Sequence, residues 1–395
     1  MEQNTQTTNE STMPEELKIA SWNVWGLLIS KKRELRIKGI SEHLKSLDAD
    51  VIVLQELWKR KDYELIKEAL GHSYKSIRFE GGLVGCGLAV FTKLDLVEGT
   101  VGFKEFSVRG RMWRFWEGDW FTGKGYVYLS LKHPQFPAPV HIINTHLQAS
   151  YGGEYAVERA VQLLDIAEHL REVKTPFYVL AGDLNTHPRE VLPWAILTQS
   201  IPLVETNLLK DSTCNLPGNT WTKKAAKAEL IDHILISPSL ASARFTCEDV
   251  QKDGRSLSDH SLLRTEINIL ANPQSYVPAG LSLESVAAIN KALTHQVQHL
   301  RRLKVIWSIL SGVALLVCLA FAISASVLAM ADPGSATALT VIMSILSPLG
   351  AALSLVFLAF ALDAKAGKAA LKNQMTEIAN LTHNSVQAVP RKQQQ

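Results

Sequence analysis

Phe177–Asn185 reads FYVLAGDLN, and the fold can be inferred by working outward from this stretch. Its first five residues are mostly apolar, which predicts a strand buried on both faces, in a sheet covered by other layers. Gly182 lets the backbone turn, so that Asp183 and Asn185 emerge at the end of the strand. A carboxylate and a carboxamide on a rigid strand end suit a site that binds phosphate and metal. Gly-Asp is also an ordinary turn pair, so this stretch alone leaves a structural explanation open.

The composition is that of a globular protein with a balanced charge. The chain has 395 residues, a formal net charge of +3 and 20% charged residues, which does not by itself indicate nucleic-acid binding. Four cysteines without a CxxC pair argue against a disulfide framework or a zinc site and fit a reducing compartment: Cys86, Cys214, Cys247 and Cys318. Residues 1–14 are polar, lack the apolar core of a signal peptide, and are expected to be a disordered lead-in.

Two long apolar runs stand near the C-terminus. Val305–Met330 and Ala336–Leu362 carry no charge, and each is long enough to cross a hydrocarbon core of about 30 Å. Because only Asp332–Ser335 separates the two, we expect a transmembrane hairpin, with a kink at Pro348 and Gly350. A buried core helix is the alternative, which such lengths disfavour.

Basic residues flank this hairpin on both sides, and its turn has none. The flanking residues are Arg301, Arg302, Lys304, Lys365, Lys368 and Lys372. The positive-inside rule therefore places both flanks and the N-terminal domain in the cytosol, with the endoplasmic reticulum or another internal membrane as the expected location. Facing the cytoplasmic leaflet, the basic flanks favour anionic phospholipids as activators.

Residues 15–272 alternate short apolar strands with few helices, which is typical of a two-layer sheet core with helices outside. The expected strands are Leu17–Val24, Val51–Leu54, Tyr74–Phe79, Gly87–Phe91, Tyr126–Leu131, Val140–Asn144, Leu230–Ile236 and Leu262–Ile269. The expected helices are Lys32–Leu47, Lys61–Leu70 and Tyr155–Leu170. A helical juxtamembrane linker at 273–304, the hairpin at 305–362 (spans 305–330 and 336–362) and a cytosolic tail at 363–395 complete the predicted α/β architecture.

Eight polar residues lie at or next to the ends of the predicted strands: Asn23, Glu56, His146, Asp183, Asn185, Asp232, Asp259 and His260. Each alone has an ordinary explanation, such as a loop acid, a capping Asn or a satisfied histidine. Gathered at one sheet edge, they supply oxygen ligands for an octahedral site plus two histidines. This set suits Mg²⁺, with Glu56 and Asp259 as its carboxylates, and the lack of clustered Cys or His ligands disfavours zinc.

Six short motifs occur in the order found in the Mg²⁺-dependent endonuclease/exonuclease/phosphatase superfamily, a helix-flanked β-sandwich fold. They are Ser21-Trp22-Asn23, Gln55-Glu56, Thr145-His146-Leu147, Gly182-Asp183-Leu184-Asn185, Ile231-Asp232-His233 and Ser258-Asp259-His260. Within it the chain resembles the membrane-anchored neutral sphingomyelinases and inositol phosphosphingolipid phospholipases C. The subfamily resemblance rests on Gly85–Lys93, on Gly118–Lys124 and on the apolar hairpin, and the whole covers about residues 17–363.

The resemblance implies a metal centre around Glu56. Glu56 ligates the essential Mg²⁺, for which Mn²⁺ is expected to substitute, with Asn23 beside it. Asp259 is then a second metal or water contact. One position departs from the pattern: many members have a basic residue before the Ile-Asp pair, whereas this chain has Leu230.

The resemblance also implies the catalytic roles. His260 is the general base that activates the attacking water, and Asp232 accepts a hydrogen bond from its ring. His146 stabilises the charge that develops on the phosphoryl oxygens, while Asp183 and Asn185 orient water and phosphate. These roles agree with the chemistry of general-base catalysis and of donors aimed at developing charge.

The run Gly118–Lys124 has the sequence GDWFTGK and fits the first part of a P-loop. Gly125 replaces the Ser or Thr that would contact Mg²⁺, and a strand rather than a helix is predicted to follow, so we exclude nucleotide binding. The resemblance implies instead that Asp119 and Lys124 form a switching pair near the substrate phosphate. A hairpin turn with a solvated Lys124 is the alternative.

An aromatic and basic set surrounds this run: Arg109, Arg111, Trp113, Arg114, Phe115, Trp116, Trp120 and Phe121. Trp and Arg favour a membrane–water interface and are suited to extracting a lipid. Alternating aromatic residues are equally typical of strand packing, so both explanations stay open.

Together these features predict an Mg²⁺-dependent sphingophospholipid phospholipase C that releases ceramide and a phosphorylated headgroup. A nuclease or an inositol polyphosphate phosphatase on the same fold is the first alternative. A nuclease would want a basic stripe for phosphates, which the balanced charge disfavours. An inactive membrane scaffold is the second, which the intact acids and histidines disfavour. The sequence leaves open whether the headgroup is phosphocholine or phosphoinositol, and it leaves the oligomeric state open.

Overall fold

The computed structural model describes residues 16–152, 154–201, 203–270, 283–331 and 336–387. It divides into two compact units, which we call the sheet unit (Met1–Phe106 and Phe121–Pro278) and the helical unit (Ser107–Trp120 and Ala279–Gln395). The lead-in expected at 1–14, the hairpin turn at 332–335, the linker residues 273–282 and the end of the tail from 388 lie outside the described residues.

The sheet unit is built from two large sheets and a small ribbon. The first sheet has the order β12-β15-β1-β2-β4-β3, with β1 Leu17–Asn23, β2 Val51–Gln55, β3 Lys75–Arg78, β4 Ala89–Thr92, β12 Leu240–Glu248 and β15 Leu262–Ile269. The second has the order β10-β11-β9-β8-β7-β5, with β6 on β7, and comprises β5 Asp95–Leu96, β6 Gly102–Glu105, β7 Gly125–Lys132, β8 Val140–His146, β9 Tyr178–Asp183, β10 Val204–Glu205 and β11 Asp232–Ile236. The ribbon pairs β13 Gln251–Lys252 with β14 Arg255–Ser256.

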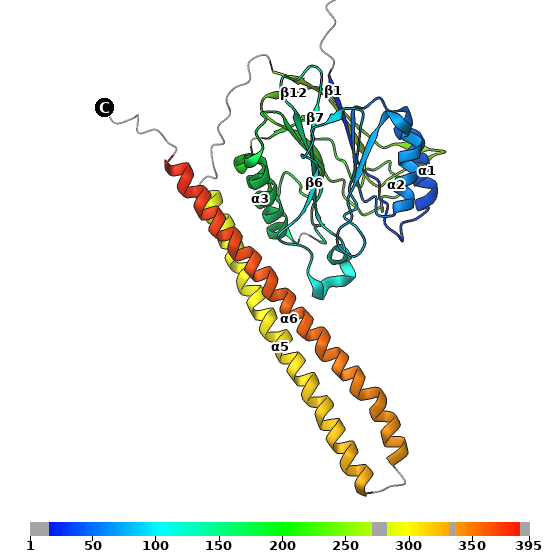
Figure 1. Cartoon of the computed structure of the whole chain (residues 1–395), viewed down its shortest axis with the longest axis vertical. Coiled ribbons are helices and arrows are strands. Elements are labelled where there is room, and N and C mark those ends of the chain that lie inside the picture. Colours follow the sequence, from blue (N-terminus) through cyan, green and yellow to red (C-terminus); the bar gives the residue numbers. More distant parts are fainter. Residues whose placement is uncertain (1–15, 153, 202, 271–282, 332–335, 388–395) are drawn as a thin grey trace, which may run out of the picture. The chain divides into compact units, whose positions relative to one another are not determined.

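Three helices flank the sheets. They are α1 Arg33–Ser46, α2 Arg60–Leu70 and α3 Ala156–Glu172. Figure 1 shows α1 and α2 on one side of the sandwich and α3 on the other. The shorter helical segments are η1 Gly71–Ser73, η2 Met112–Glu117, η3 Asp119–Phe121, α4 Val191–Ala195 and η4 Ile196–Ser200.

Alternation along the central strands divides the buried side chains between two cores. In β1, Leu17 and Ile19 point into a core between the two sheets, whereas Ala20 and Trp22 point into a second core against α1 and α2. The period of two that gives a strand two faces thus gives each face its own apolar layer. The helix-flanked two-layer architecture expected from the sequence is confirmed.

Strand direction brings the polar strand ends to one edge of the sandwich. β1 is parallel to β2, and Asn23 pairs with Gln55; β8 is parallel to β9, and His146 pairs with Asp183. β11 is antiparallel to β9, so that Asp232 at its start lies opposite Asp183. The carboxyl ends of four strands and the beginning of a fifth therefore meet, which is where the sequence placed the candidate site.

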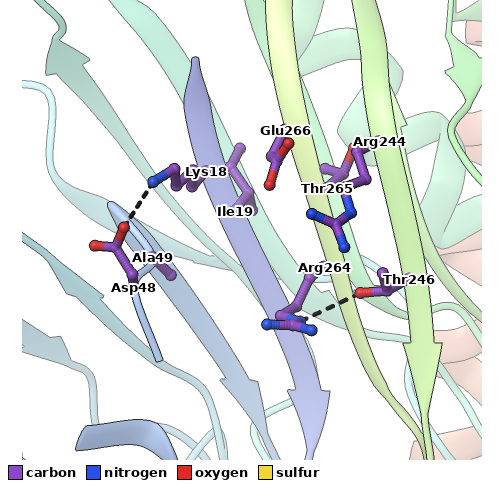
Figure 2. A pocket seen from close by; sticks show the side chains of 9 residues that line it. All are labelled: Lys18, Ile19, Asp48, Ala49, Arg244, Thr246, Arg264, Thr265 and Glu266. Atoms are coloured by element: carbon purple, nitrogen blue, oxygen red, sulfur yellow. Dashed lines mark hydrogen bonds and ion pairs between the residues drawn. The ribbon is translucent and has the colours of Figure 1, made fainter. Parts of the chain in front are cut away.

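The outer face of the first sheet carries a row of alternating charge. Lys18 on β1, Glu266 on β15 and Arg244 on β12 are register neighbours, and they line a small pocket of about 100 Å³ shown in Figure 2. In this pocket Lys18 Nζ lies 2.6 Å from an Asp48 carboxylate oxygen. Opposite charges on neighbouring strands stabilise a sheet modestly. Cross-strand pairing therefore accounts for the charged residues of this pocket without a ligand.

The helical unit contains α5 Leu283–Ala331 and α6 Ala336–Gln387, which lie side by side in Figure 1. The hydroxyls of Ser311 and Ser354 are 3.1 Å apart, and a Cβ added at Gly350 would lie 1.9 Å from Cys318 Sγ. Gly350 therefore permits close helix packing, while α6 continues as one helix through Pro348. Both helices are long and apolar enough to cross a membrane, with mean hydropathies of 2.5 and 1.7 in their most apolar stretches, which suggests membrane association.

Two of the alternatives that the sequence left open for the segment around Gly118 are wrong. Met112–Glu117 and Asp119–Phe121 are turns of 3₁₀ helix rather than a strand, so the aromatic side chains do not alternate across a sheet. Lys124 is buried rather than solvated. The strand expected after this run is confirmed as β7, which begins at Gly125.

Candidate active site

Glu56 follows β2 in the left-handed backbone region, with φ at 57°. Its Oε1 accepts a hydrogen bond of 3.1 Å from Asn23 Nδ2, and its Oε2 is buried without a hydrogen-bond partner. Gly26 packs so closely that an added Cβ would lie 2.2 Å from the Glu56 carbonyl oxygen. The carboxylate is thus fixed at the site with one oxygen left for a ligand.

Asp183 occupies the centre of the site. Its Oδ2 accepts a hydrogen bond of 2.9 Å from Asn23 Nδ2 and lies 3.5 Å from His146 Nε2. Its Oδ1 accepts one of 2.9 Å from the Asn185 backbone N–H. Asn23 therefore joins the carboxylates of Glu56 and Asp183 through its amide nitrogen, while its oxygen accepts the N–H of Trp25 at 3.0 Å.

His260 is held by a buried chain of hydrogen bonds. Its Nδ1 lies 2.9 Å from Asp232 Oδ2, and the same oxygen accepts a bond of 2.7 Å from the Thr213 hydroxyl. Its Nε2 lies 4.0 Å from Asp183 Oδ2 and 3.6 Å from Cys214 Sγ. The ring therefore turns Nε2 toward the acidic centre, as a general base requires.

Lys124 reaches the same edge from the start of β7. Its Nζ donates a hydrogen bond of 2.8 Å to the Leu147 carbonyl oxygen, which also accepts one of 3.1 Å from Asn185 Nδ2. Lys124 belongs to the sheet unit, whereas Asp119 belongs to the helical unit. The switching pair between them stays a prediction.

Burial sets the protonation of the site. It raises the pKa of Glu56 to about 7, with the charge of Asp259 adding to the effect. It also raises the pKa of Asp183, helped by Asp232. Burial opposes a charge on His260, yet the Asp232 carboxylate raises the pKa of that ring well above its usual value. Glu56 and Asp183 are both buried and both bonded to the Asn23 amide, so each carboxylate retains its proton more readily than an exposed one.

Burial acts in the other direction on His146. Together with the positive charges of Lys124 and His260, it holds the pKa of His146 well below the usual value. The ring is neutral at physiological pH; its Nε2 lies 3.5 Å from Asp183 Oδ2, and its Nδ1 is buried without a hydrogen-bond partner. A neutral donor beside the acids fits a role in stabilising negative charge.

Two overlapping groups of side chains are arranged to hold a metal ion among the described residues. They are Glu56, His146 and Asp183, and Asp183, Asp232 and His260, each with ligand atoms within 4.8 Å of one another. The unpartnered, buried Oε2 of Glu56 and the predominance of carboxylates fit a hard divalent cation such as Mg²⁺. Asp259, expected from the sequence as a second contact, belongs to neither group.

Three residues at the site had no sequence signal. Thr213 and Cys214 lie in an irregular segment. Isolated β-bridges that pair Cys214 with His260 and with Glu229 bring this segment to the site. Arg36 lies on α1, where a basic residue is commonplace, yet it is buried and donates to the carbonyl oxygens that follow β1. Leu230 is buried, and its side chain offers no charge at the position where many relatives have one.

Within the helical unit, Met112–Glu117, which we call the aromatic segment, is hydrogen-bonded to α6. The Met112 backbone N–H donates a hydrogen bond of 3.0 Å to an Asp363 carboxylate oxygen, one residue beyond the expected second span. Phe115 and Trp116 are exposed and contact each other edge to face. Exposed aromatic rings beside the end of an apolar helix fit the interfacial explanation.

Comparison with known proteins agrees with this geometry. An inositol phosphosphingolipids phospholipase C of Schizosaccharomyces pombe is 29% identical, over 73% of this chain and 76% of its own length. A putative neutral sphingomyelinase of Drosophila melanogaster is 31% identical, over 67% of this chain and 63% of its own length. Sphingomyelin phosphodiesterase 2 of Homo sapiens is 27% identical, over 67% of each chain.

Solved structures share the fold. Sphingomyelinase C from Streptomyces griseocarneus matches with a TM-score of 0.50 and 21% identity, over 64% of this chain and 99% of that one. SmcL matches with a TM-score of 0.51 and 19% identity, over 65% and 100%. Residues 20–260, more than half of the chain, match the Endonuclease/Exonuclease/phosphatase family, and they contain the whole cluster around Asp183. The resemblance seen in the motifs is confirmed, and the chain belongs to the endonuclease/exonuclease/phosphatase family.

Proposed function

We propose that this chain is a sphingophospholipid phospholipase C that depends on a divalent metal, with Mg²⁺ as the expected ion. It hydrolyses the phosphodiester on the ceramide side and yields ceramide and a phosphorylated headgroup. One observation carries the proposal: Glu56 and the Asp232–His260 pair both lie next to Asp183. The Oε2 of Glu56 is buried there without a hydrogen-bond partner. Relatives named for this activity and two helices apolar enough to cross a membrane support a lipid substrate.

His260 acts as the general base. Its Nε2 takes a proton from water, while Asp232 holds Nδ1 and stabilises the imidazolium that forms. The water oxygen bonds to phosphorus, the bond from phosphorus to the ceramide oxygen breaks, and solvent supplies the proton that the ceramide oxygen takes up. A divalent cation at Glu56 would polarise the phosphoryl group and lower the pKa of His260 by charge repulsion.

The remaining residues position the phosphate. His146 and Lys124 place a neutral donor and a positive charge where negative charge builds on the phosphoryl oxygens. Asp183 and Asn185 orient water and phosphate, and Asp259 serves as a second metal or water contact. Asp119 and Lys124 act as a switching pair.

The proposal includes a location. Both helices span an internal membrane, such as that of the endoplasmic reticulum, with the sheet unit and the C-terminus on the cytosolic side. Basic residues on both flanks support this orientation, and they make anionic phospholipids the expected activators.

The test uses the purified full chain in mixed micelles with sphingomyelin or with an inositol phosphosphingolipid. We expect mass spectrometry to detect ceramide together with phosphocholine or inositol phosphate, in Mg²⁺ or Mn²⁺ but not in EDTA or Zn²⁺. His260→Ala serves as the matched negative control. Release of nucleotides from DNA, or of phosphate from inositol polyphosphates, without any ceramide would overturn the proposal.

A further inference from the structure

The turn after β1 displays three consecutive apolar side chains to solvent. Leu27, Leu28 and Ile29 are 41%, 56% and 94% exposed. Single exposed apolar residues are ordinary, but a contiguous run at a loop tip marks a surface that meets something apolar. We call Leu27–Ile29 the apolar turn.

Hydrogen bonds anchor the apolar turn on both sides. The Ser30 hydroxyl bonds to the carbonyl oxygens of Trp25 and Leu27 at 3.0 and 2.8 Å, which closes the turn on itself. The Arg36 guanidinium donates to the carbonyl oxygens of Trp25 and Lys31 at 2.7 and 2.9 Å and stacks 4.3 Å from the Trp25 ring. A buried arginine, unused by the catalytic scheme, thus ties together the residues that precede and follow the three exposed apolar side chains.

The apolar turn lies at the catalytic edge. It begins four residues beyond Asn23, the last residue of β1 and one that contacts Asp183. A second exposed pair, Leu208 and Leu209, follows β10. β10 and β9 are each antiparallel to β11, so β10 ends at the same edge as β9. Two exposed apolar loop segments therefore lie at the edge that carries the candidate site.

A basic pocket of about 490 Å³ lies behind the apolar turn, along the first half of α1. Five basic side chains line it against two acidic ones: Lys32, Arg36, Lys38, Lys252 and Arg255 against Glu42 and Asp253. Arg36 is occupied by backbone carbonyl oxygens and Lys252 by Glu42, which leaves Lys32, Lys38 and Arg255 as the positive charges that a phosphate can meet. Trp221 and Leu35 add apolar wall. This excess of positive charge contrasts with the alternating charges of the pocket in Figure 2.

We propose that the sheet unit docks on an anionic lipid leaflet, with the apolar turn inserted among the acyl chains and the basic pocket receiving the headgroup phosphates. An apolar tip backed by positive charge matches the order in which a leaflet presents its layers. A lipid surface is at hand because the same chain carries two helices apolar enough to cross a membrane. The proposal rests on the proposed function only in that the substrate lies in this leaflet.

The first test measures docking without turnover. An environment-sensitive fluorophore is attached to Ile29→Cys in the full chain, with Cys247 and Cys318 replaced by Ala, in nanodiscs that contain phosphatidylserine and brominated lipid. We expect a blue shift and strong quenching at position 29. The matched control label at Ser46→Cys, at the end of α1 near the start of β2 and so at the opposite edge, should show neither. A label at position 29 that behaves like the one at position 46 overturns the proposal, as does a shift that appears without lipid on raising protein concentration.

The second test separates docking from chemistry. Leu28→Ser/Ile29→Ser should lower hydrolysis of bilayer sphingolipid at least tenfold and leave hydrolysis of a monomeric short-chain analogue unchanged. Leu270→Ser, an exposed apolar residue that follows β15 at the opposite edge, should change neither rate. Equal loss on both substrates, or loss on neither, overturns the docking proposal. If wild-type protein hydrolyses neither substrate, the proposed function fails while the fluorescence still decides docking.

The basic pocket has its own readout. Quenching at position 29 should rise with the phosphatidylserine fraction and fall with added salt. In Lys32→Glu/Arg255→Glu it should no longer depend on that fraction. Quenching that stays dependent on phosphatidylserine in this variant would remove the pocket from the proposal.

Discussion

At the scale of single residues, the buried carboxylate of Glu56 couples metal binding to pH. Burial raises its pKa to about 7, so the metal-free protein keeps this proton until near neutrality. A cation needs the ionised form, so binding must displace the proton. The apparent Mg²⁺ affinity should therefore fall about tenfold per pH unit below 7 and level off above it.

Calorimetric titration of the wild type and of Glu56→Gln between pH 5.5 and 8.5 checks this. The variant should bind the ion far more weakly and with a shallower dependence on pH, left by Asp183, and it should lose metal-supported hydrolysis. Glu205→Gln is a matched control, because Glu205 pairs with His233 and belongs to neither group that could hold the metal. A wild-type affinity that is flat across this range would show that Glu56 is not the ligand.

His260 and Asp232 should differ in the severity of their loss. His260→Ala removes the proton acceptor and should lower turnover by about 10²–10⁴-fold with little change in lipid binding. Asp232→Asn leaves an acceptor of the same shape beside Nδ1, so its effect should be smaller. Rates in mixed micelles under saturating Mg²⁺ decide the order. A harsher effect of Asp232→Asn would reverse the two roles.

Some residues of the site can be predicted from the sequence and others cannot. Acids and histidines at the ends of buried strands are visible, because the strand pattern says that they share an edge. Thr213 supports Asp232 from an irregular segment, and Arg36 supports the apolar turn from a helix. Their roles depend on tertiary contacts over long sequence separations, for which neither periodicity nor motif gives a signal.

At the scale of elements, the long central strands were predictable, and so was β3 at one edge of the first sheet, whereas β12 at its other edge was not. Leu262–Ile269 matches β15 residue for residue, because alternation persists along it. β12, beside it, escaped prediction because a register shift between Ser242 and Arg244 breaks its alternation. The aromatic segment was ambiguous for the opposite reason: its composition suits a strand, but Met112–Glu117 forms 3₁₀ helix.

The packing of α5 against α6 yields a prediction of its own. The hydroxyls of Ser311 and Ser354 are 3.1 Å apart, so cysteines at these positions should form a disulfide on mild oxidation. Gly350→Leu should prevent it even with alanine at position 318, because a Cβ at position 350 would lie 3.7 Å from the Cβ of residue 318 and leave no room for the rest of a leucine side chain. The assay uses a Cys318→Ala background and a protease site placed at 332–335. After cleavage, a chain cross-linked between α5 and α6 should still run as one band on a non-reducing gel, whereas an uncross-linked chain should separate into two fragments. Ser326→Cys with Ser354→Cys should not cross-link, and equal yields from both pairs would contradict the packing.

At the scale of the whole molecule, composition separates the charged sheet unit from the apolar helices. The uncharged lengths of Val305–Met330 and Ala336–Leu362 predicted two helices directly, since no globular core needs such runs. The assignment of Ser107–Trp120 to the helical unit was not predictable. It depends on contacts such as that of Met112 with Asp363, which are 251 positions apart.

The orientation of the helices is predicted from charge rather than from family. Arg301, Arg302 and Lys304 precede the first apolar run, Lys365, Lys368 and Lys372 follow the second, and the intervening turn has no basic residue. Lys and Arg near span ends favour retention on the cytoplasmic side, so both termini should be cytosolic and the turn lumenal. Protease protection on sealed microsomes, with one epitope at each terminus and one in the turn, decides this. Both terminal epitopes should be digested without detergent and the turn epitope only with it. A Met1 epitope that survives until detergent is added would place the sheet unit in the lumen, where the docking proposed for Leu27–Ile29 would face the opposite leaflet.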